Sequence, residues 1–115
     1  MKNLEELTKL VTKFRDVRDW KQFHNPKDMA ISLVLEAGEV MEHFQWKNAD
    51  EMADHLQTRK EEVADELADV LYWILLMSHD FKIDISDALK SKLKKQNKKY
   101  PIEKAKGRHT KYTEL

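Results

Sequence analysis

The chain has 115 residues and no cysteine, and its 21 acidic and 21 basic side chains cancel at neutral pH. This composition excludes disulfides, a thiolate metal site and a cysteine nucleophile, and the balanced charge argues against polymeric nucleic acid as a partner. Only two glycines and two prolines are present, which favours few, long helices in one all-α domain over residues 1–115. No stretch has the character of a signal peptide or a membrane span, so we expect no membrane partner and a cytoplasmic location.

The first two predicted helices follow from apolar spacing and from residues that begin helices. The first covers residues 4–18, where apolar side chains recur every three or four positions and Asn3 serves as the cap. The second covers residue 26 to about residue 45, with Asn25 as the cap and Pro26 at the first helical position.

The next predicted helix carries the most apolar segment of the chain. The polar stretch QWKNADEMADHLQ separates it from the second helix and is expected to hold no more than a short helical turn. Thr58 and Glu61 form a capping-box pattern, which predicts a third helix from residue 59 to about residue 79.

A fourth helix is predicted from residue 85 to about residue 99. Asp84 is placed to cap it, and Pro101 cannot continue it. The basic tail from about residue 101 is expected to be irregular. Four helices with short connections predict a four-helix bundle.

Two narrow wedges of helix surface place acids among apolar neighbours. Positions three and four apart share one face of a helix. The first wedge holds Ser32, Glu36, Glu39 and His43, and the second holds Glu62, Glu66, Asp69 and Trp73. Neither wedge contains a lysine or an arginine. If the wedges face each other, the carboxylates of Glu36, Glu39, Glu66 and Asp69 converge.

Converging carboxylates in an apolar setting need a counter-charge. Oxygen ligands without sulfur favour a hard divalent cation such as Mg²⁺ or Mn²⁺. The alternative is that each pair of acids lies at a solvated helix edge. A ferritin-like di-iron site is disfavoured, because no histidine in the chain has a glutamate three residues before it.

The acids resemble the ExxE, spacer, ExxD signature of the MazG-like all-α nucleoside triphosphate pyrophosphohydrolases. The segments RDWKQFHNP, EAGEVMEHFQW, DELADVLYW, KKYPIEKAKG and KYTEL are similar, in order and spacing, to the dCTP pyrophosphatase branch of that family. The resemblance implies hydrolysis of a deoxynucleoside triphosphate, with dCTP favoured, at the α–β bond in a house-cleaning role. It also implies Mg²⁺ ligation by Glu36, Glu39, Glu66 and Asp69, and a homo-oligomer (dimer or tetramer) with active sites at subunit contacts.

Further site residues follow from the chemistry of this reaction and from the resemblance. Glu39 is our candidate for the base that accepts the proton of the attacking water. The candidate substrate-binding residues are Trp20, Lys21, Gln22, Phe23, His24, Trp46, Asp69, Trp73, Lys92, Lys95 and Gln96. Aromatic faces would stack on the base, and the lysines would hold phosphates. Trp73 stands where related enzymes usually have tyrosine, and Gln96 where many have asparagine, which leaves the base preference open.

Two other functions remain open at this stage. One is a dUTP-type or broad deoxynucleoside triphosphate pyrophosphohydrolase on the related fold. The other is a non-catalytic helical interaction module whose acids are only surface charge. The sequence also leaves open the number of metal ions, the choice between dimer and tetramer, and the acceptance of modified nucleotides.

Overall fold

The structure is a computed structural model that describes residues 3–115, and these residues form helices and turns with no β-strand. The predicted all-α class is therefore confirmed. The chain divides into two compact units, one ending at Lys82 and the other covering Ile83–Leu115.

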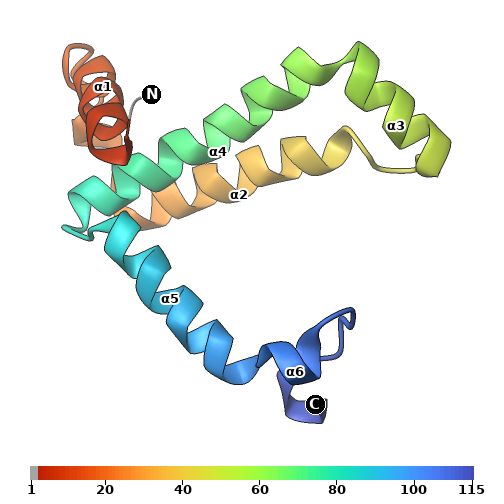
Figure 1. Ribbon diagram of the computed structural model, residues 1–115. Coiled ribbons are helices and arrows are strands. Elements are labelled where there is room, and N and C mark those ends of the chain that lie inside the picture. Colours follow the sequence, from red (N-terminus) through yellow and green to blue (C-terminus); the bar gives the residue numbers. More distant parts are fainter. Residues whose placement is uncertain (1–2) are drawn as a thin grey trace. The chain divides into compact units, whose positions relative to one another are not determined.

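The first unit is organised around one long helix. It contains α1 (Leu4–Asp16), the 3₁₀ turn η1 (Lys21–Phe23), α2 (Pro26–Glu42), α3 (Ala49–Thr58) and α4 (Lys60–Asp80). Helix α4 packs most extensively against α2 and also contacts α1 and α3. Figure 1 shows α2 and α4 running side by side. Helix α3 lies beyond one end of this pair and forms part of the connection between them. This pairing brings the two acidic motifs together.

The second unit contains α5 (Ile85–Lys99), the short helix α6 (Ile102–Ala105) and the 3₁₀ turn η2 (Tyr112–Glu114). Asp84 caps α5 as predicted, since its side chain accepts a hydrogen bond from the backbone N–H of Asp87. The expectation of an irregular tail was wrong in part. The residue after Pro101 begins a further helical turn, which the proline permits because its fixed φ suits a helix start.

The other predicted caps have mixed outcomes. The side chains of Asn3 and Asn25 each accept a hydrogen bond at 2.9 Å from the third residue of their helices, as expected. The first two helices end at Asp16 and Glu42, a few residues earlier than the apolar periodicity suggested. Helix ends are set by local hydrogen bonding, which periodicity does not report.

The connection between α2 and α4 contains more helix than the sequence predicted. It contains the ten-residue helix α3, which begins with a complete capping box between Asn48 and Glu51. The predicted box of Thr58 with Glu61 is wrong. Thr58 instead donates its hydroxyl to the carbonyl of Asp54 within α3, and α4 begins after Arg59 without a side-chain cap.

A small apolar core joins the helices of the first unit and includes one buried cation. Met29, Leu75 and Leu76 are fully buried. Arg15 is 0% exposed and donates hydrogen bonds to Asp80 at 2.7 Å and to Asp16 at 2.9 Å. This ion pair fixes the end of α1 to the end of α4, 65 positions further along the chain.

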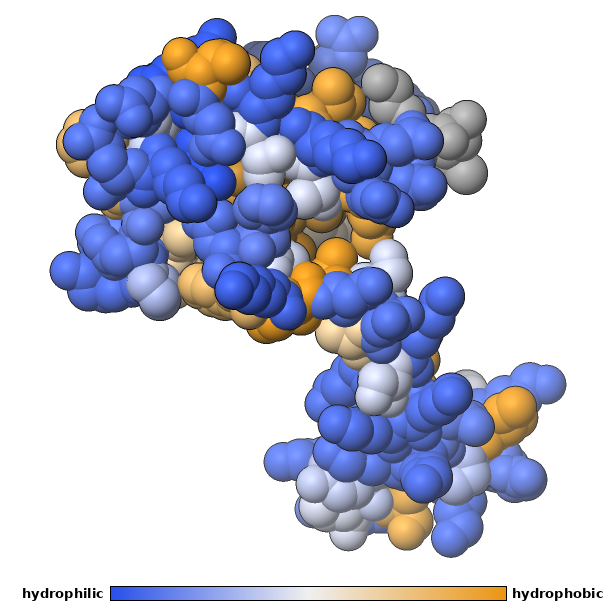
Figure 2. Space-filling model, turned by 90° about the vertical axis from the view of Figure 1, so that its left-hand side faces the viewer, coloured by the Kyte–Doolittle hydropathy of each residue, from blue (hydrophilic) through white to orange (hydrophobic). Residues whose placement is uncertain are grey.

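Apolar side chains also remain at the surface. Figure 2 shows them on one face as patches between hydrophilic residues. On α2, the side chains of Ile31, Val34 and Leu35 are 50%, 69% and 64% exposed, and with Ala30 they line an apolar hollow. Among residues 3–115, no helix combines the length and the apolar character that crossing a membrane requires.

Candidate metal and substrate site

The four acids of the two motifs meet in the first unit. Glu36 and Glu39 extend from α2, while Glu66 and Asp69 extend from α4. One carboxylate oxygen of each lies within 4.8 Å of the others. Their convergence follows from the i, i+3 spacing on two helices that pack together. The predicted geometry of the acidic cluster is thus present.

The cluster is partly withdrawn from water. Glu36 and Glu66 are half-buried, and Glu39 and Asp69 are exposed. Glu36 and Glu66 each have one buried oxygen, Oε2, that has no hydrogen-bond partner. A buried acceptor without a partner is costly, so these two oxygens favour a ligand at this position.

The carboxylates also perturb one another. Burial raises the pKa of Glu36 to about 7, with further contributions from a hydrogen bond with Glu39 and from the charges of Glu39, Asp69 and Glu66. The pKa of Glu66 is raised as well, first by a hydrogen bond with Glu39 and then by desolvation. Like charges held together disfavour ionisation. A positive counter-charge at the cluster would favour the ionised form of these carboxylates.

The donor set suits a hard divalent cation. All four residues offer oxygen, and two of these residues have a buried oxygen with no hydrogen-bond partner among the described residues. Burial and the neighbouring carboxylates raise the pKa of Glu36, and the interaction with Glu39, followed by burial, raises the pKa of Glu66. Mg²⁺ and Mn²⁺ prefer such ligands. A cation would supply the missing charge and use the unpartnered oxygens. The four acids are thus the residues that would hold the metal.

The other members of the two wedges have different environments. Ser32 donates its hydroxyl to the carbonyl of Asp28 in its own helix. His43 lies beside the cluster, with its Nε2 atom 3.8 Å from Oε1 of Glu66. Glu62 pairs instead with Arg59 at 3.2 Å on the surface. Glu62 therefore stands outside the acidic cluster, as its absence from the sequence signature suggested.

Two predicted substrate-binding residues lie against each other near this site. The rings of His24 and Trp73 are 5.1 Å apart and inclined at 61°. Trp73 follows Asp69 by one helical turn, so it continues the acidic face of α4. Nδ1 of His24 is buried without a hydrogen-bond partner. Burial also lowers the pKa of His24, with a further contribution from the charge of Arg15.

The neighbouring residues of the predicted base site are less constrained. Trp20 packs edge-on against Phe14, with ring centroids 5.8 Å apart. Lys21 and Phe23 are exposed. Gln22 donates to the carbonyl and to the side chain of Asp19, so its amide is already engaged within the loop.

Trp46 stands apart from the other aromatic residues. It is 92% exposed, and its backbone adopts the left-handed conformation with φ of +67°. This conformation disfavours a bulky side chain and is usually occupied by glycine or asparagine. No aromatic or cation–π contact of Trp46 occurs among residues 3–115, so its indole ring is accessible to a ligand.

The remaining predicted residues lie in the second unit. Lys92, Lys95 and Gln96 are all exposed on α5. Their spacing places them on one face of that helix. They form a short polar strip with two positive charges, and their assignment to the substrate remains a prediction.

Two features of the site region were missed in the sequence. The buried pair of Arg15 with Asp80 had a weak signal, since Arg15 lies four residues after Val11 on the apolar stripe of its helix. No sequence signal indicated the contact between His43 and His55, because His55 belongs to α3, which the sequence did not predict as a helix.

Comparison with known proteins places this fold and site in a family. A model of the MazG-like family matches residues 31–115, which include all four acids. The chain belongs to the MazG-like family. This confirms the resemblance drawn from the motifs.

Named relatives of this MazG-like chain are similar over most of its length. Mouse dCTP pyrophosphatase 1 is 36% identical over 114 residues, which span 97% of this chain and 67% of the mouse protein. The human dCTP pyrophosphatase 1 has the same identity and the same shares. A crystal structure of a pyrophosphatase from Archaeoglobus fulgidus matches with a TM-score of 0.82 at 39% identity, covering 88% of this chain and 94% of that chain.

Proposed function

We propose that this MazG-like chain is a nucleoside triphosphate pyrophosphohydrolase that cleaves the α–β bond of dCTP to give dCMP and pyrophosphate. The observation that carries the proposal is the convergence of four carboxylates within 4.8 Å, two of them with buried oxygens that lack a partner. The relatives named dCTP pyrophosphatase 1 support both the reaction and the substrate.

The acids would hold Mg²⁺, with Mn²⁺ as the alternative. When bound, such an ion neutralises phosphate charge and lowers the pKa of a water. Glu36 and Glu66 are half-buried and are suited to permanent ligation. Their withdrawal from solvent keeps competing water away from the ligand oxygens.

Glu39 is suited to a second role. It is exposed, and one of its carboxylate oxygens lies within 4.8 Å of an oxygen of each of the other three acids, so it can face the substrate while it stays within the cluster. We assign it as the base that takes a proton from the attacking water. The water oxygen then bonds to the α-phosphorus, the bond from that phosphorus to the bridging oxygen breaks, and pyrophosphate leaves.

The nucleoside would bind at the aromatic end of the site. The touching rings of His24 and Trp73 provide an apolar edge directly beyond Asp69. The exposed rings of Trp20 and Trp46 are available to stack on a base. The lysines of α5 would hold the outer phosphates as point charges.

The assembly belongs to the same proposal. We assign the two units to one functional domain over residues 1–115, which acts as a homo-oligomer in which a four-helix bundle is completed. The apolar hollow on α2, lined by Ile31, Val34 and Leu35, supports a contact between copies, since water is excluded most effectively from such a face.

A nucleotide panel tests the function. Purified protein with Mg²⁺ is given the four common deoxynucleoside triphosphates, dUTP and 5-methyl-dCTP, and pyrophosphate release is measured. We expect dCTP to be the best common substrate and 5-methyl-dCTP to be accepted, because an aromatic slot tolerates an apolar substituent. Preference for dUTP would establish the dUTP-type alternative. Absence of pyrophosphate with every nucleotide would favour the interaction module.

A further inference from the structure

A chain of two histidines leads away from the acidic cluster. Nδ1 of His43, the residue that caps the C-terminus of α2, lies 2.8 Å from Nε2 of His55 on α3. The other ring nitrogen of His43, Nε2, lies 3.8 Å from Oε1 of Glu66. His43 is therefore placed between a metal-site carboxylate and a helix that carries none of the four acids.

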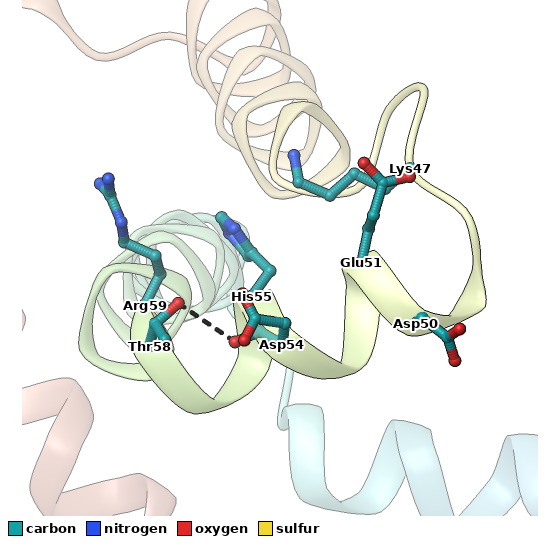
Figure 3. A pocket seen from close by; sticks show the side chains of 7 residues that line it. All are labelled: Lys47, Asp50, Glu51, Asp54, His55, Thr58 and Arg59. Carbon is teal, nitrogen blue, oxygen red and sulfur yellow. Dashed lines mark hydrogen bonds between the residues drawn. The ribbon is translucent and has the colours of Figure 1, made fainter.

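The surroundings of this chain form a hollow beside the cluster. It has a volume of about 470 Å³, and its lining includes Glu39 and Glu66 of the cluster as well as the basic residues Lys47 and Arg59. Figure 3 shows the adjoining hollow, in which His55 points inward between Lys47 and Arg59, whereas Asp50 points away. His43 is largely covered, with 14% of its side chain exposed.

The short contact between the two rings restricts their tautomers. Two unprotonated imidazole nitrogens would repel at 2.8 Å, so one of them must carry a hydrogen. If His43 Nδ1 carries it, Nε2 of a neutral His43 faces Glu66 as a bare acceptor. If His55 Nε2 carries it, then the hydrogen of a neutral His43 is on Nε2 and points toward Glu66.

Only the second arrangement suits an ionised Glu66. A carboxylate that ligates a cation is acceptor-only, and its non-ligating lone pairs are stabilised by a donor. When His55 Nε2–H donates to His43 Nδ1, the Nε2–H of His43 faces Glu66 Oε1 across 3.8 Å. That distance is longer than a hydrogen bond, but it places the positive end of the N–H dipole toward the carboxylate. Desolvation lowers the pKa of His55, and the charges of Lys47, His43 and Arg59 lower it further.

We propose that His43 and His55 are positioning residues that hold the Glu66 carboxylate for the metal, with His55 acting through His43. The inference rests on the proposed metal-dependent function. It gives α3 a role in the site although α3 contributes no ligand. The chain of contacts also fixes the C-terminal end of α2, which His43 caps, relative to Glu66 on α4.

The first test measures metal affinity apart from catalysis. Mn²⁺ is titrated into wild-type protein and into His43→Gln, His55→Gln and the double variant, and free Mn²⁺ is followed by electron paramagnetic resonance. His79→Gln is the control, because His79 is exposed on α4 and lies outside the chain of contacts. Loss of an outer hydrogen-bond partner of a metal ligand typically weakens binding by about 10- to 100-fold.

We expect a loss of this size in His43→Gln, a smaller loss in His55→Gln, and no additional loss in the double variant. Independent, additive losses would overturn the action of His55 through His43. Affinities of both single variants equal to that of His79→Gln would overturn the whole inference. A wild-type protein that binds no Mn²⁺ would instead contradict the proposed function, so the two failures are distinguishable.

The second test reads the tautomers in the wild-type protein and uses variants only to assign the signals. Long-range ¹H–¹⁵N spectra of the wild-type protein, recorded with Mg²⁺, report which nitrogen of each imidazole carries hydrogen. His43→Gln and His55→Gln assign the two rings. The expected result is hydrogen on Nε2 of both His43 and His55, with Nδ1 of His43 unprotonated. Hydrogen on Nδ1 of His43 in the metal-loaded protein would contradict the inference.

Discussion

His24 and Trp73 lie 49 positions apart in the sequence, yet their rings meet edge-on at 5.1 Å. The contact joins the loop before α2 to the face of α4 that carries Glu66 and Asp69. The contact lies within the first unit, and Trp73 follows Asp69 by one helical turn. Binding of the base by these two rings is a prediction. Trp46, with 92% of its surface exposed, has no comparable contact within the chain.

The first prediction concerns the four acids as one metal site. Glu36→Gln, Glu39→Gln, Glu66→Gln and Asp69→Asn should each reduce kcat/KM on the order of 100-fold or more, because each removes a charged metal ligand. Without metal, the same changes relieve repulsion and should raise Tm by a few degrees, since about 1 kcal/mol corresponds to roughly 4–8 °C in a domain of this size. Pyrophosphate release and thermal melts check the two effects.

The control for these substitutions is Glu62→Gln. Glu62 lies on α4, as do Glu66 and Asp69, but it pairs with Arg59 at the surface. A surface ion pair contributes little to stability. We expect its activity to remain within a few-fold of wild type. Near-wild-type turnover in all four acid variants would exclude the metal-site interpretation.

The second prediction concerns the dependence of stability on pH without metal. The pKa of Glu36 is raised to about 7 in the folded chain from an ordinary value of 4.5, so the folded state binds more protons between these values. Stability should therefore fall as pH rises from about 4.5 to about 7. Urea unfolding with a chelator present measures the slope. Glu36→Gln should flatten the curve, and adding Mg²⁺ should increase the stability most at the high end of this pH range.

Much of the fold could be predicted because helix starts are local. Asn3, Asn25 and Asp84 cap helices as expected, since a cap needs only the side chain and the N–H three residues later. The acidic cluster was predictable for a related reason. Spacing fixes which residues share a helix face, and four unneutralised acids need a common counter-charge.

The features that the sequence did not reveal depend on tertiary packing. Helix α3 is polar along most of its length, so apolar periodicity could not indicate it, although the Asn48 and Glu51 box was present. The burial of Arg15 depends on its partner Asp80, which lies 65 positions further along the chain. The pairing of His43 with His55 depends on how α3 packs, which no local pattern encodes.

The third prediction concerns this buried ion pair. Asp80→Asn removes the negative charge that lies 2.7 Å from the guanidinium of Arg15, which is 0% exposed, and should lower the free energy of unfolding by about 3 kcal/mol. Asp16→Asn is the matched control, because Asp16 contacts the same guanidinium at 2.9 Å but is half-exposed. Asp16→Asn should lower the free energy of unfolding by less than about 1 kcal/mol. Equal losses in urea unfolding would contradict the assignment of the pair as structural.

The fourth prediction concerns oligomerisation through α2. The wild-type chain should scatter light as a dimer or tetramer at micromolar concentration, and Val34→Asp should shift it toward the monomer, because a charge would be buried at an apolar contact. Val17→Asp is the control, since Val17, which follows the end of α1, is 68% exposed and Val34 on α2 is 69% exposed. A wild-type monomer, or an equal effect of both substitutions, would count against an α2 interface.

The last prediction concerns Trp46 and separates stacking from packing. If its indole ring stacks on the base, substrate binding should quench tryptophan fluorescence, and Trp46→Ala should raise KM more than it lowers kcat, since stacking stabilises ground and transition states alike. The loss should be roughly 1–3 kcal/mol, as for aromatic–base stacking in single-strand binders.

The exposure of Trp46 makes the stability of its variants equally informative. Trp46→Ala should leave Tm of the folded chain nearly unchanged, because the ring is 92% exposed and loses no packing. Trp46→Gly should raise Tm, because glycine adopts a φ of +67° without the cost of about 1–2 kcal/mol that a side chain incurs there. Both variants should share the same KM defect. A lowered Tm in Trp46→Ala with an unchanged KM would show that the ring packs against protein, and the aromatic contact with the base would then have to come from Trp20 and Trp73.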